Sequence, residues 1–546
     1  MMDKESEAEI HPLKHDDRKP RVDLENRTEK DRSFKKASRH SRFAQCRTIT
    51  FFFLLFTCLF VVFIISFIIP CPDRPISQKM WEINYNTAVT YDLMAFQDIN
   101  EDTVQDVIFL YKNSNSSSSS FNISCTNEGF STPCAFLAAV SGANGSLLWE
   151  RPVAQDVAYM ECFDQQMMSG PSSSCFIVGK NNSFLAVDSS IGVIQWHLPW
   201  YFEVNDSILS PFLIIPDVDN DEVEDLLLFF KSGREVKSYL YSRATGDQVG
   251  SMSRLNLEGE VGYIMHVTNS GAYYIIFHSA SSLYGYALKG LYEEMTGGKS
   301  MFEEDPYWKK MIDNVTHRVP PSLSSGTIRY VMKVPGNTGE DILLVKSDAC
   351  ELLDGQRLIS KWILNVSEVV RKPVLGYYKP GELAIVLENG TGVQRKILIV
   401  DAASGAVLWS HTLNSFSGTP KSASVKTADR RSAFFFWSSS NRKETVDSQK
   451  NLYMFHPIFP DNFLELTNIT KNVVAFNVLF EQNYHASYVL LTGPTRQDRP
   501  GLVSLSKQKV KENVLNSQVI WLGQARPENE QTIRDRFYEL RYKREV

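Results

Sequence analysis

The chain has 546 residues, of which 43% are hydrophobic and 22% are charged, and its net charge is −6 at pH 7. This charge is mild for the length, so the composition gives no reason to expect a nucleic-acid partner. Residues 1–47 are rich in charge and nearly free of large apolar side chains, a composition that predicts a disordered cytosolic tail.

An uncharged run from Thr48 to Ile69 follows this tail. As a helix it would be roughly 33 Å long at about 1.5 Å per residue, which is enough to cross a bilayer core. A cleaved signal peptide would have a shorter basic lead and a small-residue cleavage site. Basic residues without acids precede the run over 33–47, so the positive-inside rule places the N-terminus in the cytosol. We therefore expect a type II signal-anchor helix over 48–69 in the lipid bilayer, followed by a stalk over 70–79.

Sequons for N-glycosylation lie almost entirely beyond this run, with only Asn26 before it. Their number predicts a glycosylated extracytoplasmic segment. The candidates are Asn115, Asn122, Asn144, Asn181, Asn205, Asn314, Asn365, Asn389 and Asn468.

Six of the eight cysteines lie at or beyond the outer end of the run, where the compartment is oxidising. Pairing of near neighbours is the simplest arrangement, although spacing alone leaves crossed pairings open. Cys71 and Cys350 can pair or stay free. The expected disulfides are Cys125–Cys134 and Cys162–Cys175.

Two acidic loops share oxygen-bearing side chains at positions 1, 3, 5 and 9 and a valine at position 7. Alternate side chains of a tight loop converge, and position 7 can offer its backbone carbonyl. Such a ligand set suits Ca²⁺, which accepts six to eight oxygens. The sequence therefore predicts two structural calcium sites. Their ligands would be Asp98, Asn100, Asp102, Val104 and Asp106 in the first loop, and Asp217, Asp219, Asp221, Val223 and Asp225 in the second.

An EF-hand does not fit these loops, because it needs a glycine at position 6 and a glutamate at position 12. Position 6 is Thr103 or Glu222, and position 12 is Phe109 or Leu228. A strand-like apolar run follows each loop instead of an amphipathic helix. The alternative is an acidic surface turn without a metal, and the recurrence of the pattern beside a strand favours calcium.

A second phrase recurs between the acidic loops: an apolar run, a glycine-containing turn and a second strand that ends in tryptophan. It predicts β-hairpins. Clear copies occupy 137–149, 184–196 and 397–409, and weaker copies occupy 239–249 and 343–362. Trp149 and Trp196 are 47 residues apart, and so are Trp362 and Trp409.

This recurrence predicts an all-β fold, a β-propeller of seven or eight blades with eight favoured. A row of sandwich domains would need linkers, and none is evident. The propeller would span 80–525. Its expected blades are 92–150, 152–197, 209–252, 264–294, 328–363, 372–410, 422–457 and 472–522.

The segment Met80–Ile83 resembles the end of a blade that has no beginning, so it is a candidate to complete the last blade and close the ring. Ile520 and Trp521 compete for that place. A short helix is expected within 290–327. The charged C-terminal segment 526–546 carries a weak stripe, Ile533, Phe537 and Leu540, which favours packing on the propeller.

Catalytic motifs are missing from the sequence: the ten histidines form no H-x-x-H or H-E-x-x-H pair, and no G-x-S-x-G occurs. The chain is therefore expected not to be an enzyme, and a propeller-type enzyme is the weakest alternative.

The strand, D-x-[DN]-x-D-x-x-x-D loop and strand order resembles the FG-GAP repeats of integrin α subunits, and the phrases ending in tryptophan look like quinoprotein-type propellers. Over its full length, including the opening MMDKESEAEIHPLK, the chain is similar to the integrin-alpha FG-GAP repeat-containing family also called family with sequence similarity 234. The resemblance implies a single-pass type II protein of the cell surface or secretory pathway. It also implies metal ligands at positions 1, 3, 5 and 9 of both loops. The later segments 335–341 and 379–382 hold the place of the loop but lack most ligands.

The leading functional hypothesis is a plasma-membrane glycoprotein whose calcium-stabilised propeller binds an unknown extracellular protein or glycan, because the loops of such a ring usually carry binding. The alternative is a folding or trafficking factor in the endoplasmic reticulum or Golgi membrane.

Overall fold

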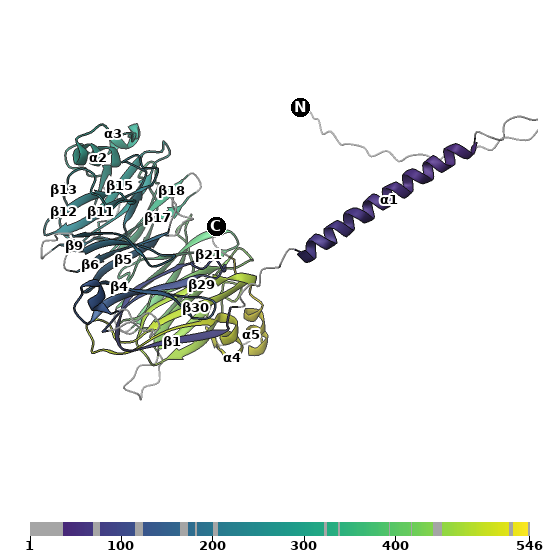
Figure 1. Ribbon diagram of the computed structural model, residues 1–546. Coiled ribbons are helices and arrows are strands. Elements are labelled where there is room, and N and C mark those ends of the chain that lie inside the picture. Colours follow the sequence, from purple (N-terminus) through teal and green to yellow (C-terminus); the bar gives the residue numbers. More distant parts are fainter. Residues whose placement is uncertain are drawn as a thin grey trace, which may run out of the picture. The chain divides into compact units, whose positions relative to one another are not determined.

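The computed structural model describes residues 37–68, 77–114, 124–163, 173–180, 183–199, 206–320, 325–336, 339–391, 394–415, 418–439, 450–523 and 528–543. The chain divides into two compact units, Met1–Arg74 and Pro75–Val546. Figure 1 shows one helix among the described residues of the first unit, and strands with a few short helices in the second.

The helix of the first unit, α1, spans Ala37–Ile68. It begins inside the segment predicted as the tail, because extending a helix that has already formed costs little free energy. Phe51 and Phe56 on it are 62% and 68% exposed. Within the described residues, no helix is both long and apolar enough to cross a membrane. The rest of the expected tail, 1–36, the last residue of the expected anchor, Ile69, and residues 70–76 of the expected stalk lie outside the described residues.

The second unit is built almost entirely of short strands. In chain order they are β1 (Met80–Gln97), β2 (Asp106–Asn113), β3 (Cys134–Val140), β4 (Leu147–Ala154), β5 (Val157–Phe163), β6 (Ser174–Gly179), β7 (Ser183–Asp188), β8 (Ile194–Pro199), β9 (Ser207–Ile208), β10 (Leu213–Ile215), β11 (Asp225–Ser232), β12 (Glu235–Tyr241), β13 (Ser253–Asn256), β14 (Val261–Val267), β15 (Tyr273–Ser279), β16 (Ser282–Ala287), β17 (Ile328–Pro335), β18 (Glu340–Lys346), β19 (Ala349–Leu353), β20 (Ser360–Asn365), β21 (Val374–Lys379), β22 (Glu382–Thr391), β23 (Gln394–Asp401), β24 (Val407–Asn414), β25 (Ala423–Lys426), β26 (Ser432–Ser439), β27 (Lys450–Phe455), β28 (Asn462–Ile469), β29 (Val473–Glu481), β30 (His485–Thr492), β31 (Gly501–Lys509) and β32 (Gln518–Trp521). Its α-helices are α2 (Leu288–Thr296), α3 (Pro306–Met311), α4 (Val510–Asn516) and α5 (Glu530–Tyr538).

These strands form antiparallel sheets of three to seven strands, made mainly of strands that are consecutive in the chain. The orders β5–β8, β17–β20 and β21–β24 are complete four-stranded blades, and β10–β13 is a blade with the extra strand β9 beside β11. The blade β14–β16 has three strands, and β25–β28 gains β32 at its outer edge. A seven-stranded sheet, β29-β30-β31-β1-β2-β3-β4, contains two blades joined through β1. The described residues thus form eight blades, the number favoured by the sequence.

The second and third strands of a blade are buried on both faces because blades pack against one another. In β2, the run from Val107 to Tyr111 is fully buried. In β11 the buried run extends from Leu226 to Phe230. Strands buried on both faces read as continuous apolar stretches rather than alternating ones. These are the same stretches that follow the acidic loops in the sequence.

The hydrophobic core is divided into clusters that lie between consecutive blades. One cluster joins the first and second blades through residues such as Leu137 and Ile177, and equivalent clusters continue around the molecule. The seventh and eighth blades share a cluster that includes Trp437 and Tyr488. A cluster with Phe136 and Val489 joins the eighth blade back to the first. This unbroken circle shows that the second unit is a closed β-propeller.

The ring closes through β1, as the sequence predicted for Met80–Ile83. Residues Met80 to Ala88 pair with β31 of the last blade, and residues Val89 to Gln97 pair with β2 of the first blade. The competing segment with Ile520 forms β32, which pairs with β28 of the preceding blade instead.

Tryptophans on outer strands interlock neighbouring blades. The Nε1 of Trp149 donates to the carbonyl of Ser189 at 2.9 Å, and its ring lies against Gly192. A Cβ at Gly192, where φ is +70°, would lie 2.6 Å from the Trp149 ring, so only glycine fits. The same contact joins Trp81 to Gly145, Trp196 to Gly246 and Trp362 to Gly405. The tryptophans of the phrases 137–149, 184–196 and 343–362 therefore contact the glycine of the next phrase.

The C-terminal segment packs on the seventh and eighth blades. Ile533, Phe537 and Leu540, the stripe noted in the sequence, are buried in the same cluster as Trp437. Tyr542 is 1% exposed and pairs with Thr427 in an isolated bridge. In Figure 1, α4 and α5 lie together beside the labels of β1 and β30.

Candidate functional site

The first acidic loop joins β1 to β2 and folds around its own carboxylates. Oδ2 of Asp98 accepts a hydrogen bond from the N–H of Thr103 at 2.8 Å, and Oδ1 of Asp102 accepts from the N–H of Val104 at 2.8 Å. The amide nitrogen of Asn100 donates to Oδ2 of Asp102 at 3.1 Å. The acidic side chains thus face the inside of the loop.

The second acidic loop joins β10 to β11 and has the same arrangement. Oδ1 of Asp217 accepts from the N–H of Asn220 at 2.7 Å, and Oδ2 accepts from the N–H of Glu222 at 2.9 Å. Oδ1 of Asp221 accepts from the N–H of Val223 at 2.8 Å. Both valines at position 7 therefore direct their N–H groups at the carboxylate of position 5.

The two loops have matching backbones. Positions 4 and 6 have positive φ in both: 58° at Glu101 and 68° at Thr103, and 66° at Asn220 and 67° at Glu222. Position 6 is where a related calcium loop has its glycine. The conformation that glycine serves is therefore retained here by side chains that adopt it at a cost.

The aspartate at position 9 ties each loop to the turn between the third and fourth strands of its blade. Asp106 accepts from the N–H of Ile99 at 2.8 Å and from the N–H of Gly142 at 2.8 Å. Asp225 accepts from Val218 at 2.7 Å and from Arg243 at 3.3 Å. Both aspartates are fully buried, and this burial raises the pKa of each carboxyl to about 6.

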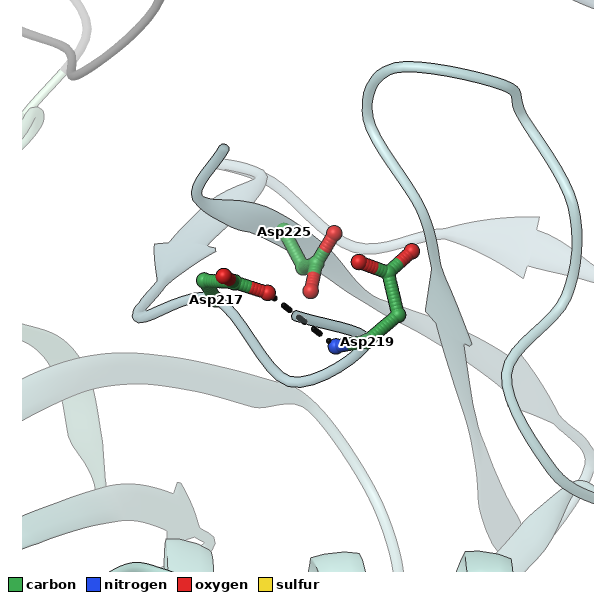
Figure 2. A group of neighbouring side chains, drawn as sticks. All are labelled: Asp217, Asp219 and Asp225. Atoms are coloured by element: carbon green, nitrogen blue, oxygen red, sulfur yellow. Dashed lines mark hydrogen bonds between the residues drawn. The ribbon is translucent and has the colours of Figure 1, made fainter. Parts of the chain in front are cut away.

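Three carboxylates of the second loop converge. Asp217, Asp219 and Asp225 each offer an oxygen, and these oxygens lie within 4.8 Å of one another. Figure 2 shows the three carboxylates around one space, with the N–H of Asp219 donating to Asp217 at 3.1 Å. Oxygens that share a Ca²⁺ ion at about 2.3–2.6 Å can be at most about 5 Å apart. The donor set of this loop therefore fits calcium.

The structure brings the ligands of the first loop together less completely. The described residues show no equivalent group of three carboxylates there. Position 3 is Asn100 in this loop and an aspartate in the second loop. The side-chain amide of Asn100 donates to the carboxylate of Asp102, and its Oδ1 accepts from the backbone N–H of Asp102 at 3.1 Å. The second loop is therefore the stronger candidate of the two.

In the fifth blade, a lysine side chain contacts the aspartate that corresponds to position 9 of the acidic loops. Asp341 occupies the start of the second strand, as Asp106 and Asp225 do, and accepts from the turn N–H of Gly355 at 3.4 Å. Nζ of Lys361 contacts its two carboxylate oxygens at 2.7 and 2.8 Å. The sequence indicated that the segment 335–341 lacks most ligands of the loop. It gave no sign of Lys361, which lies 20 residues away in β20.

Both expected disulfides are present, one between Cys125 and Cys134 and one between Cys162 and Cys175. Cys350 is free and fully buried, and burial raises the pKa of its thiol to about 12. Cys71 lies outside the described residues.

Five of the nine sequon asparagines lie in the described part of the chain. Four of them are exposed: Asn144, Asn314, Asn365 and Asn468. Asn389 is half-buried, with its Oδ1 enclosed and without a hydrogen-bond partner among the described residues. The remaining four, Asn115, Asn122, Asn181 and Asn205, lie outside the described residues.

A cavity of about 640 Å³ lies beside the fourth blade. Its walls include Tyr284, Tyr286 and His317, none of which the sequence singled out. The available signal was the missing hairpin phrase between 290 and 327, where the blade has three strands followed by α2 and α3.

Comparison with known proteins identifies a family model and several relatives that match this chain. Residues 81–543 match the model of the FAM234A/B beta-propeller. Protein FAM234A of Rattus norvegicus is 51% identical over 553 residues, covering 100% of both chains. Protein FAM234A of Homo sapiens is 52% identical over 550 residues, covering 100% of this chain and 99% of the relative. Protein FAM234B of Gallus gallus is 26% identical over 508 residues, covering 87% of this chain and 79% of the relative.

Solved structures with a similar arrangement share little sequence with the chain. The WD40 domain of SCAP from fission yeast has a TM-score of 0.43 and 10% identity, covering 78% of this chain and 98% of that domain. BamB from Moraxella catarrhalis has a TM-score of 0.40 and 12% identity, covering 78% of this chain and all of that protein. The full-length relatives and the family match together lead to one conclusion: the chain belongs to the FAM234A/B β-propeller family.

Proposed function

We propose that this chain is a membrane-anchored, non-enzymatic cell-surface glycoprotein whose calcium-stabilised propeller binds an extracellular protein or glycan. The observation that carries the proposal is the convergence of Asp217, Asp219 and Asp225 in a loop whose backbone recurs two blades earlier. Such a loop would be filled at the millimolar calcium of the extracellular space, and weak sites of this kind are typical of extracellular modules.

Two further observations support the compartment. The disulfides of the first and second blades are of the kind that persist in oxidising compartments. Exposed sequons lie on several blades, as expected of a glycoprotein. Support for the anchor comes from the sequence, where the run from Thr48 to Ile69 carries no charge.

The calcium would have a structural role, because it would stabilise the loop that binds it. Held by Asp217, Asp219, Asp221 and Asp225, with the carbonyl of Val223, it would neutralise carboxylates whose pKa burial otherwise raises, as at Asp225. It would thereby stabilise the connection between β10 and β11 and the turn that Asp225 holds. Loops at the same end of the blades would then be fixed in one arrangement, which reduces the conformational entropy lost on binding a partner.

The test of the metal uses residues 75–546 with and without calcium. We expect calcium to raise the melting temperature, because an ion that binds only the folded state stabilises it. Asp217→Ala with Asp221→Ala should remove most of that increase, whereas Asp247→Ala, an exposed acid of the same blade outside the loop, should keep it. A wild-type melting curve that is the same in calcium and in chelator would show that the sites are empty.

The test of location uses the full chain in cells. Carbonate-resistant membrane association and complex glycans are expected at the cell surface. Glycans that stay sensitive to endoglycosidase H would support the alternative, a folding or trafficking factor in the endoplasmic reticulum. A surface interaction screen that finds no saturable partner on any cell type would contradict the binding role.

A further inference from the structure

The fourth blade is built differently from its neighbours. Among the described strands it has only β14, β15 and β16, and the segment 313–319 takes the place of a fourth strand. Gly285 donates its N–H to the carbonyl of His317 at 2.9 Å, and Val319 donates to Leu283 at 3.0 Å. The cavity of about 640 Å³ opens at this irregular edge, between β16, β13 of the third blade, α2 and the segment 313–319.

Aromatic rings form one wall of the cavity. Tyr284 and Tyr286 are two residues apart in β16, so their side chains lie on the same face of the strand. The ring of His317 stacks on Tyr286 with centroids 4.4 Å apart, and the guanidinium of Arg318 lies 5.8 Å from the centre of the Tyr284 ring. His317 therefore covers one face of the Tyr286 ring.

Tyr286 lines this cavity and carries a hydroxyl group. Its side chain is more than nine-tenths buried, with 8% exposure. Its hydroxyl forms no hydrogen bond with the described part of the chain. The hydroxyl oxygen is not enclosed by these residues, so it is accessible. Since Tyr286 lines the cavity, its hydroxyl is available to a ligand inside it. A tyrosine hydroxyl that is accessible at a cavity wall can both donate a hydrogen bond to a ligand and accept one from it.

The polar lining carries both signs of charge. Arg254 and Asn256 of β13 and Glu294 of α2 also line the cavity. Glu294 already accepts from Ser253 at 2.8 Å, and Arg254 is paired with Glu235 at 3.6 Å. A lining with this balance of charge suits a neutral ligand with many hydroxyl groups better than an ion.

From this lining we propose that the cavity is a saccharide-binding site. A pyranose ring has an apolar C–H face, which packs on the electron-rich face of an aromatic ring, and hydroxyls around its edge, which need donors and acceptors. Tyr284, which is less buried than Tyr286, offers the ring face, and the Tyr286 hydroxyl, Asn256 and Glu294 offer the polar partners.

One saccharide is within reach of the cavity if the chain is glycosylated. Asn314, the first residue of the sequon Asn314-Val315-Thr316, is exposed and lines the same cavity. An N-acetylglucosamine attached there would start from the lining of the cavity. This source rests on the extracytoplasmic location proposed above. A sugar of another molecule is the second source of the same chemistry.

The decisive experiment maps glycans on the full chain made in mammalian cells and follows their release by peptide-N-glycosidase F without denaturation. We expect the Asn314 glycan to be released at least about tenfold more slowly than those of Asn365 and Asn468, and equally fast after denaturation. Tyr284→Ala should remove this protection. Tyr273→Ala, a half-buried tyrosine of the same blade that packs on Phe302 outside the cavity, should keep it.

A glycan array probed with the full chain covers the second source. Binding that is lost in Tyr284→Ala and weakened in Tyr286→Phe, which removes only the hydroxyl, would support the site even if Asn314 carries no glycan. Two results together overturn the inference. The first is an Asn314 glycan that is absent or is released as fast as the others. The second is an array without any binding that depends on Tyr284. If no sequon at all is glycosylated, the proposed location fails, while the array still decides the saccharide site.

Discussion

Individual residues of this propeller place titratable groups in its interior, and His456 is an example. It is fully buried beside Thr427, with its Nε2 at 3.2 Å from the Thr427 hydroxyl. Its Nδ1 accepts from the N–H of Ile458 at 3.4 Å, which requires an unprotonated Nδ1. Burial, the largest cause, lowers the pKa of His456 to about 4, although Asp429 opposes this effect.

The pH dependence of stability follows from that pKa. Between pH 6.5 and about 4 the unfolded chain binds a proton at His456 and the folded chain does not, so the free energy of unfolding falls as the pH falls. One such group contributes at most about 1.4 kcal/mol per pH unit. His456→Asn, which leaves an amide near Ile458, should flatten the curve measured by urea denaturation over this range. The exposed His197 replaced by asparagine should leave it unchanged, and equal curves for wild type and His456→Asn would contradict the assignment.

The sequence predicted the residues of the acidic loops and their spacing, because those are local properties. It did not predict that Thr103 and Glu222 would hold the conformation usually left to glycine. Nor could it show that Lys361 neutralises Asp341, since the two residues meet only after β18, β19 and β20 have paired.

At the scale of elements, the hairpin with its tryptophan and glycine is the unit that repeats. Each unit is predictable from the sequence because the turn and the strand lengths are encoded locally. The pairings between units are not, as the fourth blade shows. Its third strand runs directly into α2, and its outer edge is covered by the segment 313–319, a partner that no local pattern indicates.

The interlock between units can be tested with two matched glycines. Ala at Gly192 would meet the ring of Trp149, whereas Ala at Gly233, where φ is +57°, would meet no atom within 4 Å. Both variants bear the cost of a positive φ, about 1–2 kcal/mol. Gly192→Ala should in addition lose about 1–3 kcal/mol through overpacking. Urea denaturation measures the difference, and equal losses would show that the Trp149 contact does not join the blades.

At the scale of the whole molecule, stability depends on a ring that has no open edge. The N-terminal half of β1 covers β31 and supplies Trp81, Tyr85 and Ala88 to the cluster between the last and first blades. The sequence indicated this closure through the similarity of Met80–Ile83 to the end of another blade. It left Ile520 as a competitor, because two strands of similar composition can be distinguished only by the edges that they reach.

Removal of the closing strand should therefore affect the entire propeller. A chain that begins at residue 89 loses Trp81, and burial of one tryptophan alone is worth about 3–5 kcal/mol. Since whole domains are stable by only about 5–15 kcal/mol, we expect a large fall in melting temperature relative to a chain that begins at residue 75. Addition of a peptide of residues 77–88 should restore part of it. An unchanged melting temperature in the shorter chain would mean that the ring does not need this strand.

The shared strand β1 also has a consequence for synthesis. Its first half leaves the ribosome early, but its partner β31 ends at Lys509. At about 5–20 residues per second, the ribosome needs roughly 20–80 s to make the intervening chain. During that interval the backbone N–H and C=O groups around Trp81 have no strand to pair with. The nascent protein therefore has its greatest need of a chaperone at its beginning, and that need ends only when its last blade arrives.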